Sequence, residues 1–308
     1  MVTNKLKEGL KLFYFSLFNK NGIKNFLTLV FAFTFKKKGK FVCPNGFVLD
    51  FDKNNFYDIL RVYLFSLIEG VKFNNELKGY WKYKNGIITT PNGIKIKSKS
   101  FNRFIFAETF LYDIHFCDFD LHGKTVVQAG GFVGDTALYY AARGAKVYSF
   151  EPEPNLYRLG LENIALNPKL SKNIIFKNYA IGKDELIEFP LVKSVSGGAS
   201  AYSLENRQTV KVKSLSISTI LKIFKINEPF ILDLDIKGKE FEVIEDPSIS
   251  KFKIVRIEFS PKIGNIKIGE RNYLIKKLKE YGFKEIRIYK HSNGVYDLND
   301  NGTIEAKK

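Results

Sequence analysis

Apolar and polar residues alternate in blocks along the second half of the chain. Short apolar runs are separated by segments in which apolar residues recur every three or four positions. The runs predict buried strands and the segments predict helices, and this alternation is typical of a parallel sheet covered by helices. The expected strands are 125–129, 146–150, 173–178, 230–235 and 252–259, and the expected helices are 134–142, 154–166, 239–245 and 270–281.

The end of the chain has a different pattern. Apolar and polar residues alternate over 285–289 and 295–298, on either side of the turn residues Ser292-Asn293-Gly294. This predicts a hairpin, so the last strand should run antiparallel to its neighbours. Two further β-like runs, 186–193 and 209–215, flank a loop at Gly197-Gly198. We therefore expect an α/β, Rossmann-like fold with a mostly parallel sheet.

The first third of the chain is less regular. Residues 56–69 have helical periodicity, and Asn85-Gly86 joins two short β-like runs as hairpin turns do. We expect a helical and hairpin extension over 1–104, followed by a Rossmann-like domain over 105–308.

Positive charge is concentrated near the start of the chain. The net charge is +17, and residues 1–40 contain nine lysines and the single acid Glu8. Such a field attracts lipid headgroups, nucleic acid or anionic glycans, but it is equally compatible with a solubilising surface. The apolar run 26–35 is about half as long as a membrane span. It is either a helix docked on the catalytic core or a helix lying on an anionic membrane surface through residues 1–40.

Cysteine and histidine are scarce. Cys43 and Cys117 lie far apart, and the three histidines form no local cluster, so we expect neither a disulfide nor a metal site. No cleavage site follows the apolar run, which argues against a secretory signal. The expected location is cytoplasmic, with peripheral membrane association as the alternative.

The most informative motif is a glycine turn that follows the first expected strand. Gly130, Gly131 and Gly134 lie in this turn, and Glu151 ends the next strand about 20 residues later. Nucleotide-binding βαβ units place an acid at this interval, against ribose hydroxyls. Glycines allow the backbone to turn sharply and to approach a ligand closely. Phe132 occupies a position where a dinucleotide site requires glycine, so the pattern favours adenosine with a small tail, and S-adenosylmethionine first.

The region 105–260 resembles the FkbM-type S-adenosylmethionine-dependent methyltransferases. Six ordered blocks carry the resemblance, and they are 106–110, 128–137, 147–152, 178–182, 235–240 and Glu258. A parallel sheet that ends with one antiparallel strand is also the class I methyltransferase pattern. The resemblance implies methyl transfer from S-adenosylmethionine, commonly to a hydroxyl on a sugar, glycolipid or related metabolite.

The resemblance also implies roles for individual residues. Contact with the methionyl end would involve Glu108, Thr109 and Gln128, and the adenine would meet the backbone of Ala180. The remaining expected cofactor-binding residues are Gly130, Gly131, Gly134, Glu151 and Pro152.

Two acids near the end of the fourth expected strand are candidates for a catalytic base. Asp235 and Glu240 lie where ligands bind in open α/β sheets. The alternatives are a helix cap for Asp235 and a helix-dipole acid for Glu240. Glu258 is expected to pair with Arg256 or a nearby lysine.

The sequence departs from the family pattern at four positions. Gln128 replaces an acid, Phe132 an asparagine and Lys237 a glutamate, while Asp233 takes a position where the family often has lysine. The last two changes suggest an ion pair between Asp233 and Lys237 with reversed polarity. Two other functions stay open: an RNA methyltransferase, favoured by the charge, and a binding protein that has lost its chemistry.

Overall fold

The structure of the protein is a computed structural model. The chain forms two compact units, Met1–Cys117 and Asp118–Lys308. We describe each unit by itself, and the expected division after residue 104 stays a prediction. The structure describes residues 22–35, 38–42, 48–52, 63, 80–90, 92–100, 109–110, 120–192, 208–263, 266–289 and 302–308.

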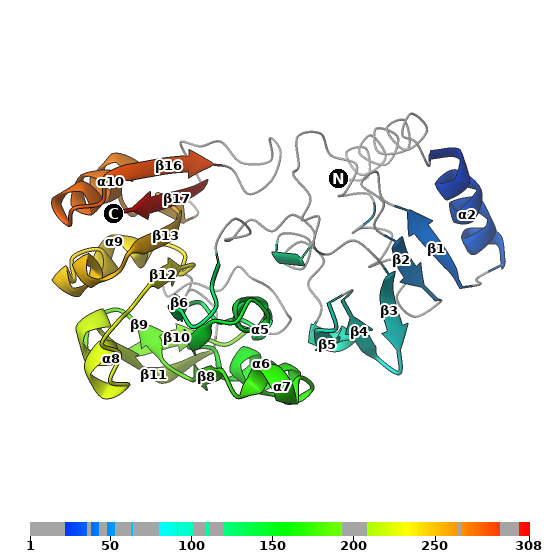
Figure 1. The fold of residues 1–308 in the computed structure, drawn as a ribbon, viewed down its shortest axis with the longest axis horizontal. Coiled ribbons are helices and arrows are strands. Elements are labelled where there is room, and N and C mark those ends of the chain that lie inside the picture. The colour runs from blue at the N-terminus through cyan, green and yellow to red at the C-terminus, as the bar shows by residue number, and fades with distance from the viewer. Residues whose placement is uncertain are drawn as a thin grey trace. The chain divides into compact units, whose positions relative to one another are not determined.

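The second unit is built on a seven-stranded sheet (Figure 1). Its strands lie in the order β16-β17-β13-β12-β6-β7-β8. All neighbours from β13 to β8 are parallel, and β17 is antiparallel to both β13 and β16. This confirms the Rossmann-like fold with its antiparallel last strand. The bounds are β6 Thr125–Ala129, β7 Lys146–Phe150, β8 Ile174–Lys177, β12 Ile231–Leu234, β13 Ile254–Phe259, β16 Glu285–Tyr289 and β17 Gly302–Lys307.

The last described strand lies later in the chain than the expected run. The described partner of β16 is Gly302–Lys307, with Glu285 opposite Lys307 and Tyr289 opposite Thr303, and the run expected over 295–298 lies outside the described residues. The segment Gly302–Lys307 contains Glu, Ala and Lys, which are depleted in strands, so its local sequence gave little strand signal. It is a strand because Ile304 and Ala306 point into the core of the sheet.

Helices cover both faces of this sheet. The four expected helices are present as α5 (Asp135–Ala142), α6 (Pro154–Ala165), α9 (Glu240–Val243) and α10 (Arg271–Glu280). α6 begins after Glu153, whose carboxylate accepts a hydrogen bond from the Leu156 N–H, a typical N-terminal cap. The sequence pattern did not predict three short helices, which are α7 (Pro168–Ser171), α8 (Ile217–Ile223) and η4 (Pro247–Lys251).

Two small sheets accompany the large one. The expected pair of β-like runs forms β10 (Glu185–Pro190) and β11 (Thr209–Leu215), which are antiparallel, and β11 also pairs with β9 (Ala180–Ile181). The strands β14 (Lys262–Ile263) and β15 (Ile266–Lys267) form a two-stranded ladder.

The two faces of the large sheet differ in chemistry. One face is apolar and packs against α8, α9, η4 and α10 in a single hydrophobic cluster. The opposite face, toward α5, carries polar side chains at directly paired positions of six neighbouring strands. We call these residues the polar row, and they are Ser149, Gln128, Asp233, Arg256, Glu305 and Arg287. The row crosses the sheet two residues before the strand ends at which Asp235 and Glu258 lie.

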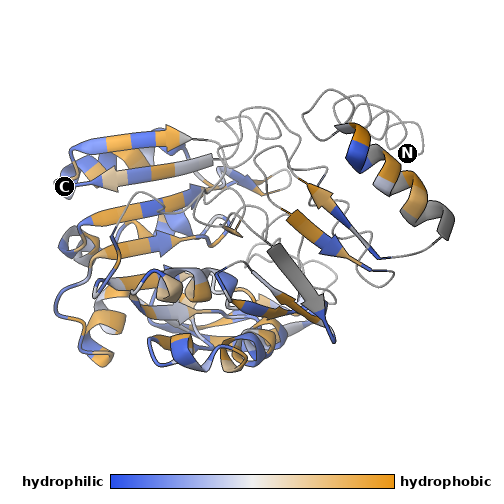
Figure 2. Cartoon of the chain, turned by 45° about the vertical axis from the view of Figure 1, so that its right-hand side comes forward, coloured by the Kyte–Doolittle hydropathy of each residue, from blue (hydrophilic) through white to orange (hydrophobic). Residues whose placement is uncertain are grey.

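The described part of the first unit contains helix α2 (Gly22–Phe35) and a five-stranded sheet. Hydrophobic residues occupy much of the coloured part of α2 in Figure 2. The strands, in order, are β1 (Gly39–Val42), β2 (Val48–Phe51), β3 (Tyr80–Lys84), β4 (Ile87–Thr89) and β5 (Lys95–Lys97), and η2 (Ser98–Ser100) follows. The expected turn at Asn85-Gly86 joins β3 to β4, and both residues have positive φ. The helix expected over 56–69 lies outside the described residues except for Tyr63. Among the helices described, none has the length and apolar content that a membrane crossing requires.

Candidate functional site

The glycine turn connects β6 to α5 at the end of the sheet where Glu151 and Asp235 lie. The N–H groups of Gly130 and Gly131 both donate to the carbonyl of Phe150, at 3.0 and 2.8 Å. Gly130 and Gly134 have φ of 84° and 77°, in the left-handed region that favours glycine. The predicted tight turn is therefore present.

The glycines are needed mainly because the protein packs against itself. A Cβ on Gly130 would lie 2.0 Å from the carbonyl oxygen of Asp235, and one on Gly131 would lie 2.5 Å from the ring of Phe176. At Gly134, a Cβ would lie 3.2 Å from the carbonyl oxygen of Gly160 in α6. Packing within the protein thus already restricts Gly130 and Gly131 to glycine, and close approach of these glycines to a ligand stays a prediction.

Glu151 lies directly after β7 and its side chain is buried. One carboxylate oxygen accepts a hydrogen bond from the N–H of Phe132, at 2.7 Å, and the other accepts one from the N–H of Glu153, at 2.8 Å. Burial raises the pKa of Glu151 to about 8, although these two N–H groups oppose the rise. The negative charges of Glu153 and Asp235 raise the pKa further. The acid is therefore held against the glycine turn and is costly to ionise without a partner.

Asp135, the first residue of α5, is a second buried acid at the turn. Its side chain is 3% exposed, and its Oδ1 atom has no hydrogen-bond partner among the residues that the structure describes. Burial raises the pKa of Asp135 to about 7, with a further contribution from the charge of Asp235. A buried acceptor without a partner points to a group that would complete the site.

Asp235 and Glu258 share the ammonium group of Lys237. The Nζ of Lys237 lies 3.2 Å from Oδ1 of Asp235 and also contacts Oε1 of Glu258 at the end of β13. Burial alone would lower the pKa of Lys237, but the two carboxylates raise it well above its ordinary value. The expectation that Glu258 pairs with a nearby lysine is confirmed.

The expected ion pair between Asp233 and Lys237 is wrong. Asp233 accepts hydrogen bonds from the Arg256 guanidinium, at 2.5 Å, and from the Tyr140 hydroxyl, at 2.7 Å, within the polar row. The reason is register: Asp233 lies inside β12 directly opposite Arg256, whereas Lys237 follows the strand in a left-handed turn with φ of 39°.

Glu240, the other candidate base, is fully buried at the start of α9. Its two carboxylate oxygens accept hydrogen bonds from the backbone N–H groups of Gly238 and Ser260. Burial raises the pKa of Glu240 to about 7, while these N–H groups lower it. The contacts tie the loop after β12 to the end of β13, so a catalytic role for Glu240 stays a prediction without geometric support.

Gln128 contacts protein groups at both polar ends of its side chain. Its Oε1 accepts a hydrogen bond from the Ser149 hydroxyl at 2.7 Å, and its Nε2 donates to the carbonyl of Gly130 at 3.3 Å. A carboxylate at this position could not donate to Gly130, which explains why an amide suits this chain. Gln128 therefore links the glycine turn to β7 through these two hydrogen bonds.

The other expected cofactor-binding residues are dispersed. Pro152 and Glu151 both accept from the Asn178 amide through their carbonyls, at 2.9 and 2.8 Å, and Ala180 begins β9 two residues later. Asn178 is a positioning residue that the sequence analysis missed, and its place directly after the third strand was the available signal. Thr109 is buried in the first unit, and Glu108 lies outside the described residues.

The comparisons with known proteins agree with this arrangement. The profile of the methyltransferase FkbM domain matches residues 128–287, more than half of the chain. The chain belongs to this family. No match was found among curated proteins.

Solved structures also align with this FkbM-family chain. A precorrin-6y C5,15-methyltransferase from Geobacter metallireducens is 10% identical over 61% of this chain and 80% of its own, with a TM-score of 0.35. Magnesium protoporphyrin IX methyltransferase from Synechocystis, solved with bound S-adenosylmethionine, is 15% identical over 61% and 72%, with a TM-score of 0.37. An O-methyltransferase from Thermotoga maritima is 14% identical over 61% and 60%, with a TM-score of 0.34. At these scores the alignments add nothing to the strand order given above.

Proposed function

We propose that this methyltransferase transfers the methyl group of S-adenosylmethionine to a hydroxyl of a neutral acceptor, such as a sugar, glycolipid or related metabolite. The observation that carries the proposal is the excess of acid where the strands end. Asp135, Glu151, Asp235 and Glu258 contribute four carboxylates there, and Lys237 contributes one ammonium group that two of them already share.

The donor set fits S-adenosylmethionine. The Glu151 carboxylate would accept hydrogen bonds from the ribose hydroxyls, as acids at this position of nucleotide-binding units do. The Oδ1 of Asp135 offers a further buried acceptor. When bound, the donor supplies an electrophilic methyl group on a positively charged sulfur. Buried acids stabilise a cation of this kind, and its arrival would in turn favour their ionised forms.

Asp235 is our candidate for the base that takes the hydroxyl proton. Its side chain is 38% exposed, whereas that of Glu258, which shares the same lysine, is 16% exposed. The Lys237 ammonium lies 3.2 Å from this carboxylate, which would accept the hydroxyl proton as the methyl group is transferred. Most of the rate acceleration would come from alignment of the methyl group and the acceptor.

The charge of the site argues against an acceptor rich in phosphate. The chain as a whole is strongly basic, which is the observation that favours RNA. A phosphate beside Asp235 and Glu258 would meet two carboxylates and the one ammonium of Lys237, whereas a neutral hydroxyl compound would meet no like charge.

The test is transfer of a labelled methyl group to neutral oligosaccharides, glycolipids and RNA. We expect transfer to a neutral acceptor, and a fall in kcat of about 10²-fold or more for Asp235→Asn at saturating donor, whose affinity is measured separately by calorimetry. Glu228→Gln, an exposed acid in the loop before β12, is the matched control. Methylation of RNA alone would refute the proposal, and absence of any heat with S-adenosylmethionine would favour the binding protein without chemistry.

A further inference from the structure

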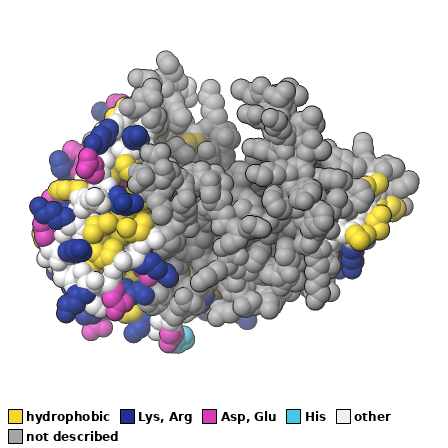
Figure 3. Space-filling model, turned by 90° about the horizontal axis from the view of Figure 1, so that it is seen from above, with side chains coloured by type: hydrophobic (Ala, Val, Ile, Leu, Met, Phe, Trp, Pro, Cys, Tyr) yellow, Lys and Arg dark blue, Asp and Glu magenta, His cyan; other side chains and the backbone are white. Residues whose placement is uncertain are grey.

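Helix α2 exposes a continuous apolar stripe. Four of its side chains are largely accessible: Ile23 at 70%, Leu27 at 61%, Phe31 at 48% and Val30 at 47%. At 100° per residue these positions lie within about 100° of one another around the helix axis. Seen from above, they form a hydrophobic patch with a basic side chain next to it, at the right of the molecule (Figure 3). We call these four residues the α2 stripe.

The opposite side of α2 is fixed to the sheet of the first unit. The buried Asn25 donates to the Val42 carbonyl at 2.7 Å and accepts from the Val42 N–H at 2.9 Å. The same amide donates to the hydroxyl of Tyr63 at 2.9 Å. These three hydrogen bonds set the rotation of the helix about its axis, so the outward direction of the α2 stripe follows from specific contacts.

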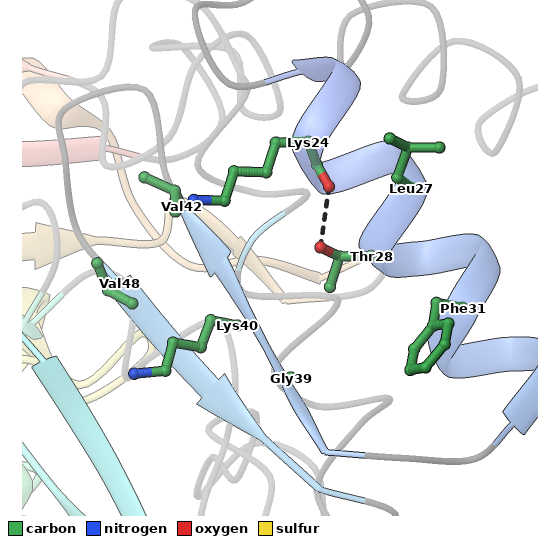
Figure 4. Close-up of a pocket in the computed structure, with 8 residues that line it drawn as sticks. All are labelled: Lys24, Leu27, Thr28, Phe31, Gly39, Lys40, Val42 and Val48. Carbon is green, nitrogen blue, oxygen red and sulfur yellow. Dashed lines mark hydrogen bonds between the residues drawn. The ribbon is translucent and has the colours of Figure 1, made fainter.

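Lysines surround the stripe and the groove beside it. Leu27 and Phe31 line a groove of about 600 Å³ between α2 and the strands β1 and β2. Lys24 and Lys40 also line it, and Figure 4 shows the side chain of Lys24 extending toward Val42 and that of Lys40 extending from β1 toward β2. Lys38 is exposed where the chain leaves the helix. The one acid paired with these lysines among the described residues is Asp50, 3.6 Å from Lys40.

We propose that the α2 stripe and its lysines dock the protein on the surface of an anionic lipid bilayer. A helix with an exposed apolar face and flanking lysines lies in the plane of the interface, with its apolar side chains below the headgroups. The lysine ammonium groups then lie at headgroup level, where each Lys near an anionic surface strengthens binding. The net charge of residues 1–40 is positive, as attraction to an anionic surface requires, because this segment contains nine lysines and one acid. A second copy of the chain would bring its own lysines against these and is disfavoured by charge. The inference does not depend on the acceptor of methyl transfer.

The experiment is flotation of the full chain with vesicles of phosphatidylcholine, with and without phosphatidylglycerol. We expect partition only onto vesicles that contain phosphatidylglycerol, and a decrease as salt is raised. Leu27→Glu with Phe31→Glu should lower the partition coefficient at least about tenfold, since two apolar anchors become charged. The matched control is Leu186→Glu with Ile223→Glu, which charges two exposed apolar residues of the second unit, 70% and 53% accessible.

A second pair of variants tests the lysines. Lys24→Gln with Lys38→Gln should weaken binding, whereas Lys222→Gln with Lys251→Gln, which removes the same charge from the second unit, should not. Circular dichroism and the melting temperature of every variant establish that it is folded.

Three results would overturn the proposal. The first is equal binding to both kinds of vesicle. The second is loss of binding when inorganic phosphate replaces chloride at constant ionic strength, which would assign the lysines to free phosphate. The third is a dimer in sedimentation that Leu27→Glu with Phe31→Glu converts to monomer, which would assign the stripe to a second copy.

Discussion

Replacing Glu151 by Gln should raise the stability of the protein at high pH and lower its affinity for the cofactor. The ordinary pKa of this carboxyl is 4.5, and burial raises it to about 8. Between these values the folded protein holds a proton that the unfolded chain has released. The free energy of unfolding therefore falls as the pH rises through this window, and the full penalty is present above pH 8 and absent below pH 4.5.

The size of the penalty follows from the pKa difference. The difference between 8 and 4.5, at 1.36 kcal/mol per unit, gives an upper limit of about 5 kcal/mol at pH 9. Glutamine cannot ionise, so it removes the penalty, but it keeps only one oxygen for the two N–H groups of Phe132 and Glu153. Leaving one buried donor unsatisfied costs about 1–3 kcal/mol. The variant should thus be less stable than the wild type at pH 5 and more stable by up to about 2–4 kcal/mol at pH 9.

Urea unfolding at pH 5, 7 and 9 measures the difference in stability between the variant and the wild type, which should change sign over this range. Glu228→Gln is the control, and its stability should follow that of the wild type. Calorimetry with S-adenosylhomocysteine gives the second half of the prediction. The wild-type affinity should rise by up to about tenfold per pH unit below 8, because ribose hydroxyls donate to the ionised carboxylate, and the affinity of Glu151→Gln should be low and flat. A stability difference that is the same at all three pH values would refute the burial argument. Parallel affinity profiles would refute the ribose contact.

Three further substitutions test the packing beneath the site, each by urea unfolding. Gly130→Ala should destabilise the protein by about 2 kcal/mol or more, because its Cβ would lie 2.0 Å from the Asp235 carbonyl oxygen at a φ of 84°; a cost under 0.5 kcal/mol would contradict this. Arg256→Met should cost about 3–5 kcal/mol, since it leaves Asp233 buried without its cation, and Asp233→Asn in the same chain should recover part of the loss; additive costs would contradict the pairing. Tyr140→Phe should cost about 1–3 kcal/mol through the lost hydrogen bond to Asp233, and an unchanged stability would contradict a stabilising role for this hydrogen bond.

The sequence predicted the parallel part of the sheet because its strands are buried on both faces. Val126, Val127 and Val147 belong to short apolar runs that are unambiguous when turn residues bound them. Helix α8 was missed because residues 217–223 offer only two turns, too few for the periodicity to stand out. It forms because Ser216 caps it, accepting a hydrogen bond from the Thr219 N–H, and Ile217 and Ile220 pack in the core.

The candidate site was predicted less completely, because its contacts depend on register between strands. Glu151 could be placed from its interval after the glycines, since a βαβ unit fixes that distance locally. The partners of Asp233 and Lys237 could not be placed in the same way. Two residues four apart in sequence are neighbours on a helix, but they are not neighbours when one lies in a strand and the other in the turn after it. Arg256 and Glu258 reach them from the adjacent strand, 23 and 21 residues away, and no local pattern encodes that pairing.

The pairing of the strands also places the charged residues of the site in two groups, one beside β12 and β13 and the other beside β6 and β7. On the side of β12 and β13, the acids Asp233, Asp235 and Glu258 each contact a cation: Arg256 lies against Asp233 within the sheet, and Lys237 lies between the other two carboxylates at its edge. On the side of β6 and β7, Asp135 and Glu151 have no cation among their described contacts, and burial raises the pKa of both. A positively charged donor would thus be stabilised most beside β6 and β7, where the acids are unbalanced. A neutral acceptor would meet the side of β12 and β13, where Asp235 lies against Lys237 and would take the hydroxyl proton.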